Sequence, residues 1–291
     1  MLYFLYLAGI FIAKILPLKV CYSLAAVISR MYFMFAGRDK EELRENLKIV
    51  FGTEVEKKQL DRYVFEVFFN FAKYLADFFK TFEIKEKYVN DNIKVQGSEN
   101  LDKALEKGKG AIVVTIHLGN WELAGRVIGM LKYQVSAIAL EHEDKRVNEL
   151  FVKQRAESGV KSIFVGKAEI KECFKALKRN EVLGILGDKD YTSNGIYVDF
   201  FKKKARLPKG PAVFSLKTGA PIVFCVMVRG RSDEYQMYFK EPVFPEATDD
   251  YNKDLEIIMK KYIILFEESI QKYPGQWYAF RRIWGQEKIT Q

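Results

Sequence analysis

The chain has 291 residues, 49% of them hydrophobic and 14% aromatic, which is enough to bury a sizeable core and excludes intrinsic disorder. The net charge of +9 favours an anionic partner such as an acidic membrane surface, an acidic carrier or a phosphorylated substrate. A generally lysine-rich composition is the alternative. The cysteines Cys21, Cys173 and Cys225 are far apart among apolar residues, which argues against a disulfide framework and structural zinc and indicates a reducing compartment.

Residues 1–38 are predicted to form a membrane anchor. They contain no acidic residue, and their two apolar runs, 2–13 and 20–29, are separated by a lysine and a proline. Each run is shorter than the roughly 20 apolar residues that a membrane span needs. The pattern therefore favours a hairpin at the membrane surface, with basic residues near anionic head groups. A single tilted span and a buried pair of soluble helices are the alternatives, whereas a signal peptide is not indicated.

Residues 39–291 are expected to form one domain that opens with two helices, 39–50 and 56–82. The second helix carries a narrow polar stripe on an otherwise aromatic surface. The stripe consists of Glu66, Asn70, Lys73, Asp77 and Lys80. We expect this helix to lie between layers of the core, because aromatic stripes are usually buried. Contact with acyl chains or with the membrane is the alternative.

From residue 93 strand-like and helix-like segments alternate, which predicts an α/β fold with helices on both faces of a sheet. The predicted strands are IKVQG, AIVVTI, QVSAIAL, KSIFV, VLGILG, IYVDFF and PIVFCVMV. The predicted helices are 99–107, 120–132, 144–158, 169–180, 208–218 and 251–272.

The candidate site lies in AIVVTIHLGNWELAG, where an apolar strand ends in His117. Sites in open α/β sheets form beyond the carboxyl ends of strands. Gly119 permits a sharp turn, Asn120 can cap the following helix, and Glu122 lies in its first turn. The glutamate is predicted to accept a hydrogen bond from the imidazole, whose other nitrogen then takes a proton from an alcohol. The alternative is a structural histidine at a strand end.

The chain offers no serine or cysteine nucleophile near this pair, so the spacing favours direct attack by a substrate hydroxyl on an acyl group. The second histidine, His142, lies in EHED. It is predicted to be a solvated loop residue, with a metal or acid/base role as the alternative.

Several blocks, in chain order, resemble the bacterial lipid A late acyltransferases of the lysophospholipid acyltransferase superfamily and their mannoside-acylating relatives. The blocks are RENLKIVF, HLGNWE, VKQRAESGV, GDKDYTSNGIYVDFFKKKARLPKGPAVFSLKTGAPIVF and YPGQWYAFRRIW. The resemblance spans residues 17–284 and implies a mixed sheet flanked by helices, behind an N-terminal helical membrane anchor. In ALEHEDK the chain is closer to the mannoside-acylating branch.

By this resemblance His117 is the general base and Glu122 its orienting partner. Gly119 and Asn120 are assigned to the substrate site with them. Arg155 falls at an arginine position that would bind substrate phosphate or support the dyad.

The resemblance also places Asp188 and Asp190 in a D-x-D/N turn, where they would hold the loop or contact a sugar or a positive side chain. Arg206, Pro208 and Gly210 match the segment that bounds the acceptor site.

The segment FFKKKARLPKG has five basic residues within nine positions, including Lys203, which we assign to substrate binding. It is interpreted either as a solvated loop or as a contact for lipid phosphates or an acidic acyl carrier protein. Nucleic acid is not an expected partner, because the chain lacks a nucleic-acid fold signature. Lys202 stands where the family commonly has glycine. At the C-terminal end Trp277, Phe280 and Trp284 are expected to pack on the core or to rest at the membrane interface.

The predicted function is acyl transfer from an acyl carrier protein or CoA thioester to a glycolipid hydroxyl, in the first instance on a lipid A precursor. The predicted location is the cytoplasmic face of the bacterial inner membrane. No metal or bound cofactor is expected. The alternatives are acylation of a phosphatidylinositol mannoside or a lysophospholipid, hydrolysis of the thioester, and lipid binding without catalysis.

Overall fold

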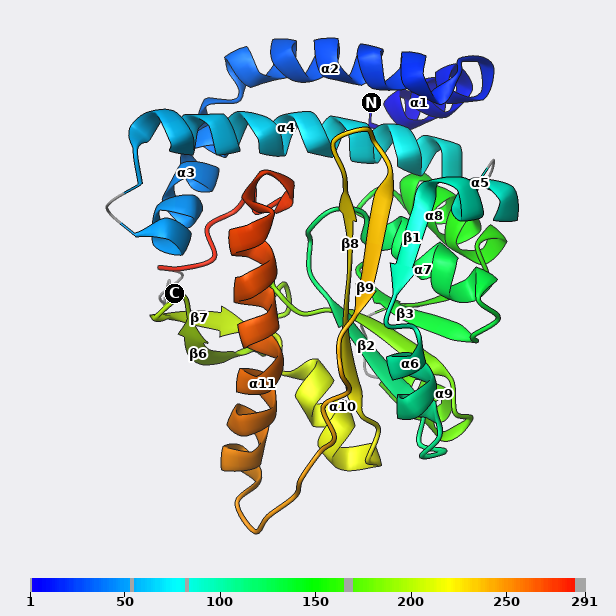
Figure 1. Cartoon of the computed structure of the whole chain (residues 1–291), viewed down its shortest axis with the longest axis vertical. Helices are drawn as coiled ribbons and strands as arrows, with labels where there is room; N and C mark the ends of the chain where they lie inside the picture. The colour runs from blue at the N-terminus through cyan, green and yellow to red at the C-terminus, as the bar shows by residue number, and fades with distance from the viewer. Residues whose placement is uncertain (1, 53–54, 82–83, 165–169, 286–291) are drawn as a thin grey trace.

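The central feature is a mixed seven-stranded sheet in the order β1-β9-β8-β2-β5-β3-β4 (Figure 1). The computed structural model describes residues 2–52, 55–81, 84–164 and 170–285. β2 runs parallel to β5 and β8, while β9 runs antiparallel to β8. The strands are β1 (Ile93–Gln96), β2 (Ala111–Thr115), β3 (Val135–Ala139), β4 (Val160–Phe164), β5 (Val182–Leu186), β8 (Ile222–Arg229) and β9 (Tyr235–Phe239). The predicted α/β class, with a mixed sheet flanked by helices, is confirmed.

Each face of the sheet buries its own apolar core, because successive side chains of a strand point to opposite faces. In β2, Val113 packs with α5 (Glu86–Asn92), α6 (Glu99–Leu105) and α7 (Trp121–Met130). Its neighbours Ile112 and Val114 pack with the opposite layer. That layer consists of α9 (Ile170–Lys178), α10 (Gly210–Thr218) and α11 (Tyr251–Lys272), while α8 (Lys145–Glu157) packs beside β4. Both faces of β2 are therefore dry, as expected for a central strand.

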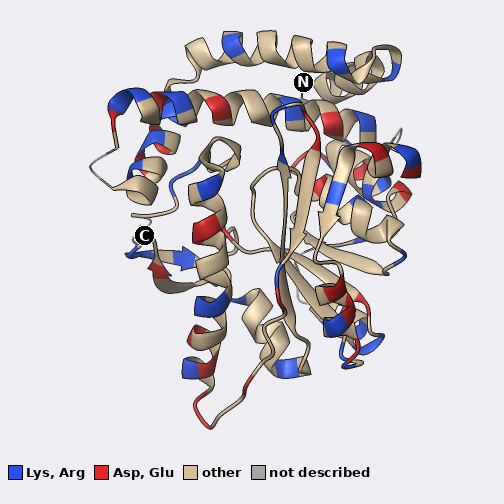
Figure 2. Ribbon diagram, in the orientation of Figure 1, with Lys and Arg blue, Asp and Glu red and all other residues tan. Residues whose placement is uncertain are grey.

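A separate helical layer crosses one end of the sheet (Figure 1). It consists of α1 (Leu2–Ile15), α2 (Leu18–Phe35), α3 (Gly37–Phe51) and α4 (Lys57–Lys80). α1 and α2, called the N-terminal hairpin below, cover the two apolar runs and pack on α4 through Ala13, Cys21, Tyr22 and Ala25. α2 carries few charges along its length (Figure 2), and by length and composition it is the one described helix that is able to cross a membrane. α4 therefore lies between the hairpin and the core, as predicted.

The polar stripe of α4 faces protein rather than solvent. Asn70 donates to the carbonyl of Gly275 at 2.8 Å, and Lys73 pairs with Asp233 at 2.6 Å. Asp77 is buried and accepts hydrogen bonds from residues on α2 and β9. The stripe therefore fixes α4 to the loops at this end of the sheet.

Two strands lie where none was predicted. β7 (Lys203–Leu207) pairs with β6 (Ile196–Phe200), within the segment interpreted as a solvated loop. Buried and exposed residues alternate in β7, with Ala205 and Leu207 buried, but its lysines gave the segment the composition of a surface loop. β9 has the same period in YQMYF, where Tyr235, Met237 and Phe239 are buried. The period-two signal was thus present in both segments.

The β6–β7 hairpin turns through Phe201 and Lys202, at φ values of 52° and 59°. Two adjacent residues with positive φ are the pattern of a type I′ hairpin turn, which favours glycine. This geometry accounts for glycine being favoured at the position that Lys202 occupies in this chain.

The other boundaries agree with the prediction to within a few residues. Residues 82, 165 and 169, at the ends of three predicted elements, lie outside the described part of the chain. After a 3-10 turn at Pro274–Gln276 the C-terminal segment is irregular rather than helical. Trp277 and Trp284 are buried in the core, which decides between the two expectations for these residues. Cys21, Cys173 and Cys225 are all buried and none is in a disulfide, as expected of core cysteines.

Candidate active site

His117 lies just beyond the carboxyl end of β2, beneath α4. Its carbonyl oxygen accepts a hydrogen bond from the amide of Tyr278 at 2.8 Å, and its ring packs edge-on against Trp121 at 5.0 Å. The side chain is only 14% exposed. The backbone hydrogen bond from Tyr278 and the ring contact with Trp121 together fix the position of the imidazole.

The carboxylate that orients this imidazole is Asp188, at the end of β5. Its Oδ1 lies 2.7 Å from His117 Nδ1, and its Oδ2 accepts from the His117 amide and from Trp277 Nε1, both at 3.1 Å. β2 and β5 are paired neighbours, so their carboxyl ends bring the two residues together. This arrangement leaves His117 Nε2 as the nitrogen available for proton transfer.

The charge states suit a general base. Burial lowers the pKa of His117, against the opposing effect of Asp188, so the imidazole is neutral near pH 7. Burial alone would raise the pKa of Asp188, but His117, Lys189 and Trp277 together outweigh burial, and the carboxyl pKa falls to about 2. A neutral imidazole beside an ionised carboxylate is ready to accept a proton and to be stabilised as imidazolium.

Glu122 is placed differently from the expectation. Its carboxylate receives two hydrogen bonds from Arg155, from Nη2 at 2.6 Å and from Nε at 3.0 Å, and it does not form the predicted hydrogen bond with the imidazole. The reason is direction, because Glu122 points from the first turn of α7 toward Arg155 on α8, whereas the Nδ1 edge of the imidazole faces Asp188 at the end of β5. Burial lowers the pKa of Arg155, but Glu122 outweighs that effect and raises it. The Glu122–Arg155 pair therefore ties α7 to α8.

Gly119 and Asn120 shape the turn between His117 and α7. Gly119 has φ = +68°, and a Cβ there would lie 1.8 Å from the carbonyl oxygen of Met227, so no other residue fits without movement. Asn120 caps α7 by accepting from the Leu123 amide at 3.0 Å. Its amide nitrogen donates to Asp77 and Tyr235. Both residues are therefore occupied in holding the turn.

The opening beside His117 is a cavity of about 270 Å³, bounded mainly by aromatic residues of α1, α4 and the C-terminal segment. Two cationic side chains, Lys189 and Arg281, line it together with His117. The other lining residues are Tyr6, Phe71, Tyr74, Leu75, Phe78, Trp121, Phe151, Tyr191, Tyr278 and Phe280. Because Tyr6 belongs to α1, the hairpin forms part of the wall.

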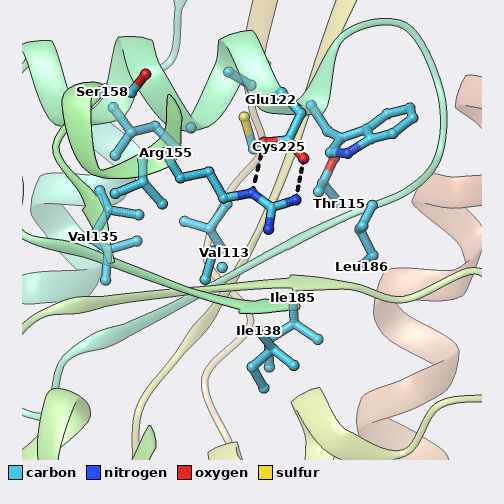
Figure 3. Close-up of a pocket in the computed structure, with 18 of the residues that line it drawn as sticks. Val113, Thr115, Glu122, Val135, Ile138, Arg155, Ser158, Ile185, Leu186 and Cys225 are labelled. Carbon is cyan, nitrogen blue, oxygen red and sulfur yellow. Dashed lines mark hydrogen bonds and ion pairs between the residues drawn. The ribbon is translucent and has the colours of Figure 1, made fainter. Parts of the chain in front are cut away.

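A second cavity, of about 90 Å³, lies between the sheet and helices α7 and α8 (Figure 3). Val113, Val135, Ile138 and Ile185 give it an apolar lining, and the Glu122–Arg155 pair borders it. Phe78 and Trp121 line both this cavity and the one that contains His117. The two spaces are therefore separated by these two aromatic side chains.

The remaining predicted residues lie outside both cavities. Asp190 is ion-paired with Arg206 at 3.0 Å and accepts from the amides of Thr192 and Gly195, so it holds the turn before β6. Lys203 lines a separate, open cavity of about 310 Å³, together with Arg282.

His142 is half-buried against the ring of Phe151 at 4.4 Å, rather than free in solvent. Among the described residues no group of three His, Cys, Asp or Glu side chains is arranged to hold a metal ion.

The sequence did not single out Lys189, and it gave no role to Trp277 as a hydrogen-bond donor to Asp188. Lys189 was readable as the residue between two aspartates in GDKD, but only the fold turns its side chain toward His117. Asp77 was recognised only as part of the polar stripe of α4, and Arg229 was not singled out; the two form a buried ion pair near the turn between His117 and α7.

Comparisons with known proteins all identify acyltransferases. The model of a family described as bacterial lipid A biosynthesis acyltransferase matches residues 1–286. The phosphatidylinositol mannoside acyltransferase of Mycobacterium tuberculosis is 25% identical over 251 residues, which cover 84% of this chain and 77% of that protein. The corresponding protein of Mycolicibacterium smegmatis is 26% identical, with 84% and 79% covered. The lipid A biosynthesis palmitoleoyltransferase of Escherichia coli is 24% identical over 269 residues, with 92% and 85% covered.

Proposed function

The chain belongs to the bacterial lipid A biosynthesis acyltransferase family, and from that premise we propose that it moves a fatty acyl chain from a thioester to a glycolipid hydroxyl, in the first instance on a lipid A precursor. The predicted resemblance is confirmed by this match, and so is the prediction of an O-acyltransferase. The observation that carries the proposal is the His117–Asp188 pair, which opens into an aromatic cavity beside an apolar hairpin.

In the proposed reaction His117 Nε2 takes the proton of the acceptor hydroxyl. The oxygen then attacks the thioester carbonyl, forming the C–O bond, and the C–S bond breaks when the tetrahedral intermediate collapses. The imidazolium returns its proton to the departing thiolate. Asp188 keeps the proton of the neutral ring on Nδ1 and stabilises the charged ring. The balance needs no metal or bound cofactor, only an acyl carrier protein or CoA thioester as co-substrate.

We assign the acyl chain to the apolar cavity behind Phe78 and Trp121. At about 90 Å³ it is smaller than the engineered cavity of about 150 Å³ that admits benzene, so it takes only a few carbons before its walls move. In this scheme Glu122 and Arg155 act as a neutralised pair that holds α7 and α8 around the chain.

The hairpin is proposed to rest in the membrane surface rather than to cross it. One face of α1 and α2 packs on α4, which opposes an upright orientation of either helix. The other face exposes large apolar side chains, including Phe11, Val27 and Phe35, an arrangement typical of an interfacial amphipathic segment. The basic residues of the hairpin would meet anionic head groups, at the cytoplasmic face of the inner membrane.

The exposed lysines at the start of β7 are proposed to receive an acidic acyl carrier protein. Lys203 and Lys204 lie beside Arg282 on one rim of the open cavity. Complementary charge of this kind accelerates association and fixes orientation more than it adds affinity.

A phosphatidylinositol mannoside is the second candidate acceptor, favoured by the names of the mycobacterial relatives. The test supplies an acyl carrier protein thioester with a lipid A precursor, a phosphatidylinositol mannoside or a lysophospholipid, and follows the product by mass spectrometry. The proposal expects transfer to one lipid that is lost in His117→Ala. Thiol release without any lipid acceptor would indicate a hydrolase, and stoichiometric lipid binding without turnover would indicate a binding protein.

A further inference from the structure

Two cations converge on the cavity that contains His117. Lys189 follows β5, and Arg281 comes from the irregular C-terminal segment. The other described lining residues are aromatic or leucine apart from the histidine itself, and none of them is acidic. An aromatic cavity with two positive charges and no negative one is matched to an anionic group of a ligand.

Lys189 is half-buried, and its neighbouring carboxylates are engaged elsewhere. Its Nζ donates to the carbonyl oxygen of Tyr278 at 2.7 Å, which leaves further N–H donors. Asp188 accepts from His117 and Trp277, while Asp190 is paired with Arg206. Burial lowers the pKa of Lys189, Asp188 opposes this, Arg281 adds to it, and the resulting pKa is about 8.

Arg281 lies at the exposed rim of the same cavity. Its guanidinium lies over the ring of Tyr191, at 5.8 Å from the centroid, and it forms no ion pair with a carboxylate of the described residues. Its backbone carbonyl is fixed by a hydrogen bond of 2.8 Å from Asn46. A stacked guanidinium keeps its in-plane donors free for a planar or tetrahedral oxyanion.

The arginine that the family resemblance linked to phosphate is not available for this task. Arg155 is held by both oxygens of Glu122 on the far side of Trp121, beside the apolar cavity. A phosphate in the cavity of His117 would therefore meet Lys189 and Arg281 instead.

We propose that Lys189 and Arg281 form a phosphate-binding subsite, which holds a phosphate ester of a substrate next to His117. The inference rests on the proposed acyl transfer only for the identity of the substrate, since phosphate binding is measurable without turnover. The phosphate comes either from the acceptor head group or from the pantetheine arm of the donor.

The binding test uses dihexanoyl phosphatidic acid as the phosphate probe and dihexanoylglycerol as the uncharged control, both as monomers. Lys189→Met and Arg281→Gln should each weaken binding of the phosphate probe by roughly tenfold or more, with no change for the control. Arg179→Gln is the matched control variant, because Arg179 pairs with Glu181 at the opposite end of the sheet. Since Arg281 is exposed, its variant tests the subsite even if Lys189→Met fails to fold. Unchanged binding of the phosphate probe by a folded Arg281→Gln overturns the proposal.

The kinetic arms identify the source of the phosphate. Each variant is assayed with acceptors that carry or lack phosphate, and with acyl-phosphopantetheine against acyl-pantetheine. A rise in KM that disappears with the dephosphorylated acceptor assigns the subsite to the acceptor, and one that disappears with acyl-pantetheine assigns it to the donor. A rise that persists with both overturns the proposal. Loss of phosphate binding in the variants of a protein that transfers no acyl group supports the subsite and refutes the function.

Discussion

Replacement of Asp188 by asparagine tests the assignment of the orienting carboxylate. The side chain keeps its shape, so the oxygen that accepts from the His117 amide and from Trp277 Nε1 can stay in place. The other position becomes an NH₂ group facing Nδ1, 2.7 Å away. The imidazole must then accept at Nδ1 and carry its proton on Nε2, so it is no longer a base at the nitrogen that faces the cavity.

The expected loss in kcat is about 10²–10⁴-fold, the usual contribution of a general base. At about 1.4 kcal/mol for each factor of ten, this corresponds to about 3–5 kcal/mol of transition-state stabilisation. The same change in serine protease triads costs about 10⁴-fold for the same reason of tautomer. Stability should fall by about 1.5–3 kcal/mol, the contribution of one hydrogen bond to a charged group.

The assay compares kcat and KM of the wild type, Asp188→Asn and Asp190→Asn under saturating thioester, with circular dichroism as the control for folding. Asp190 is the matched carboxylate, because it pairs with Arg206 rather than with His117. KM should stay nearly constant in Asp188→Asn while kcat falls. The assignment of Asp188 is refuted if a folded Asp188→Asn variant keeps a near-wild-type kcat while a Glu122→Gln variant loses activity. That result would favour the His117–Glu122 pair expected from H-x4-E.

Four further outcomes are expected. The rate should fall as pH drops through the pKa of His117, which burial holds below its ordinary value of 6.5, and a pH profile of kcat/KM checks this. Phosphate binding should weaken as pH rises through about 8, where Lys189 loses its proton, and a pH profile of probe binding checks that. Glu122→Gln should destabilise the fold by about 3–5 kcal/mol by leaving Arg155 buried without its carboxylate, and adding Arg155→Met should recover part of that loss in denaturant unfolding. Gly125→Val should shift the preference toward shorter acyl chains in a chain-length series, because Gly125 lines the apolar cavity and an added Cβ there meets only Val160, at 3.6 Å; an unchanged preference would exclude this cavity as the acyl site.

The sequence predicts those parts of the site that are local in the chain. A strand end followed by Gly119 and Asn120 dictates a turn and a capped helix, so the position of His117 follows from a few neighbouring residues. Asp188 is 71 residues away and meets His117 only because β5 pairs with β2. Spacing alone assigned Glu122 as the partner of His117, because it is the nearer carboxylate in the sequence. No local sequence pattern shows which carboxylate the fold brings to the imidazole.

The same distinction holds for the fold. The alternation of strand-like and helix-like segments predicted the fold class and most boundaries. A strand that is buried on both faces consists of a continuous apolar run such as AIVVTI, which is easily recognised in the sequence. β7 was not predicted because Lys203 and Lys204 occupy exposed positions of the β6–β7 hairpin, and such a charged segment has the composition of a solvated loop. β9 pairs with its neighbour β8 through a short turn, but its place beside β1 depends on a pairing between segments far apart in the chain.

The attachment of the N-terminal hairpin has a practical consequence. Tyr22 donates a hydrogen bond to Asp77, which also binds Arg229 and Tyr235 beneath the turn between His117 and α7. Tyr6 forms part of the wall of the cavity that contains His117. Deleting residues 1–38 to obtain a detergent-free protein would remove Tyr22 from Asp77 and open the cavity along α4. Solubilisation is better pursued by replacing outward-facing apolar residues such as Phe11 and Val27, because that change leaves the inner face of the hairpin intact.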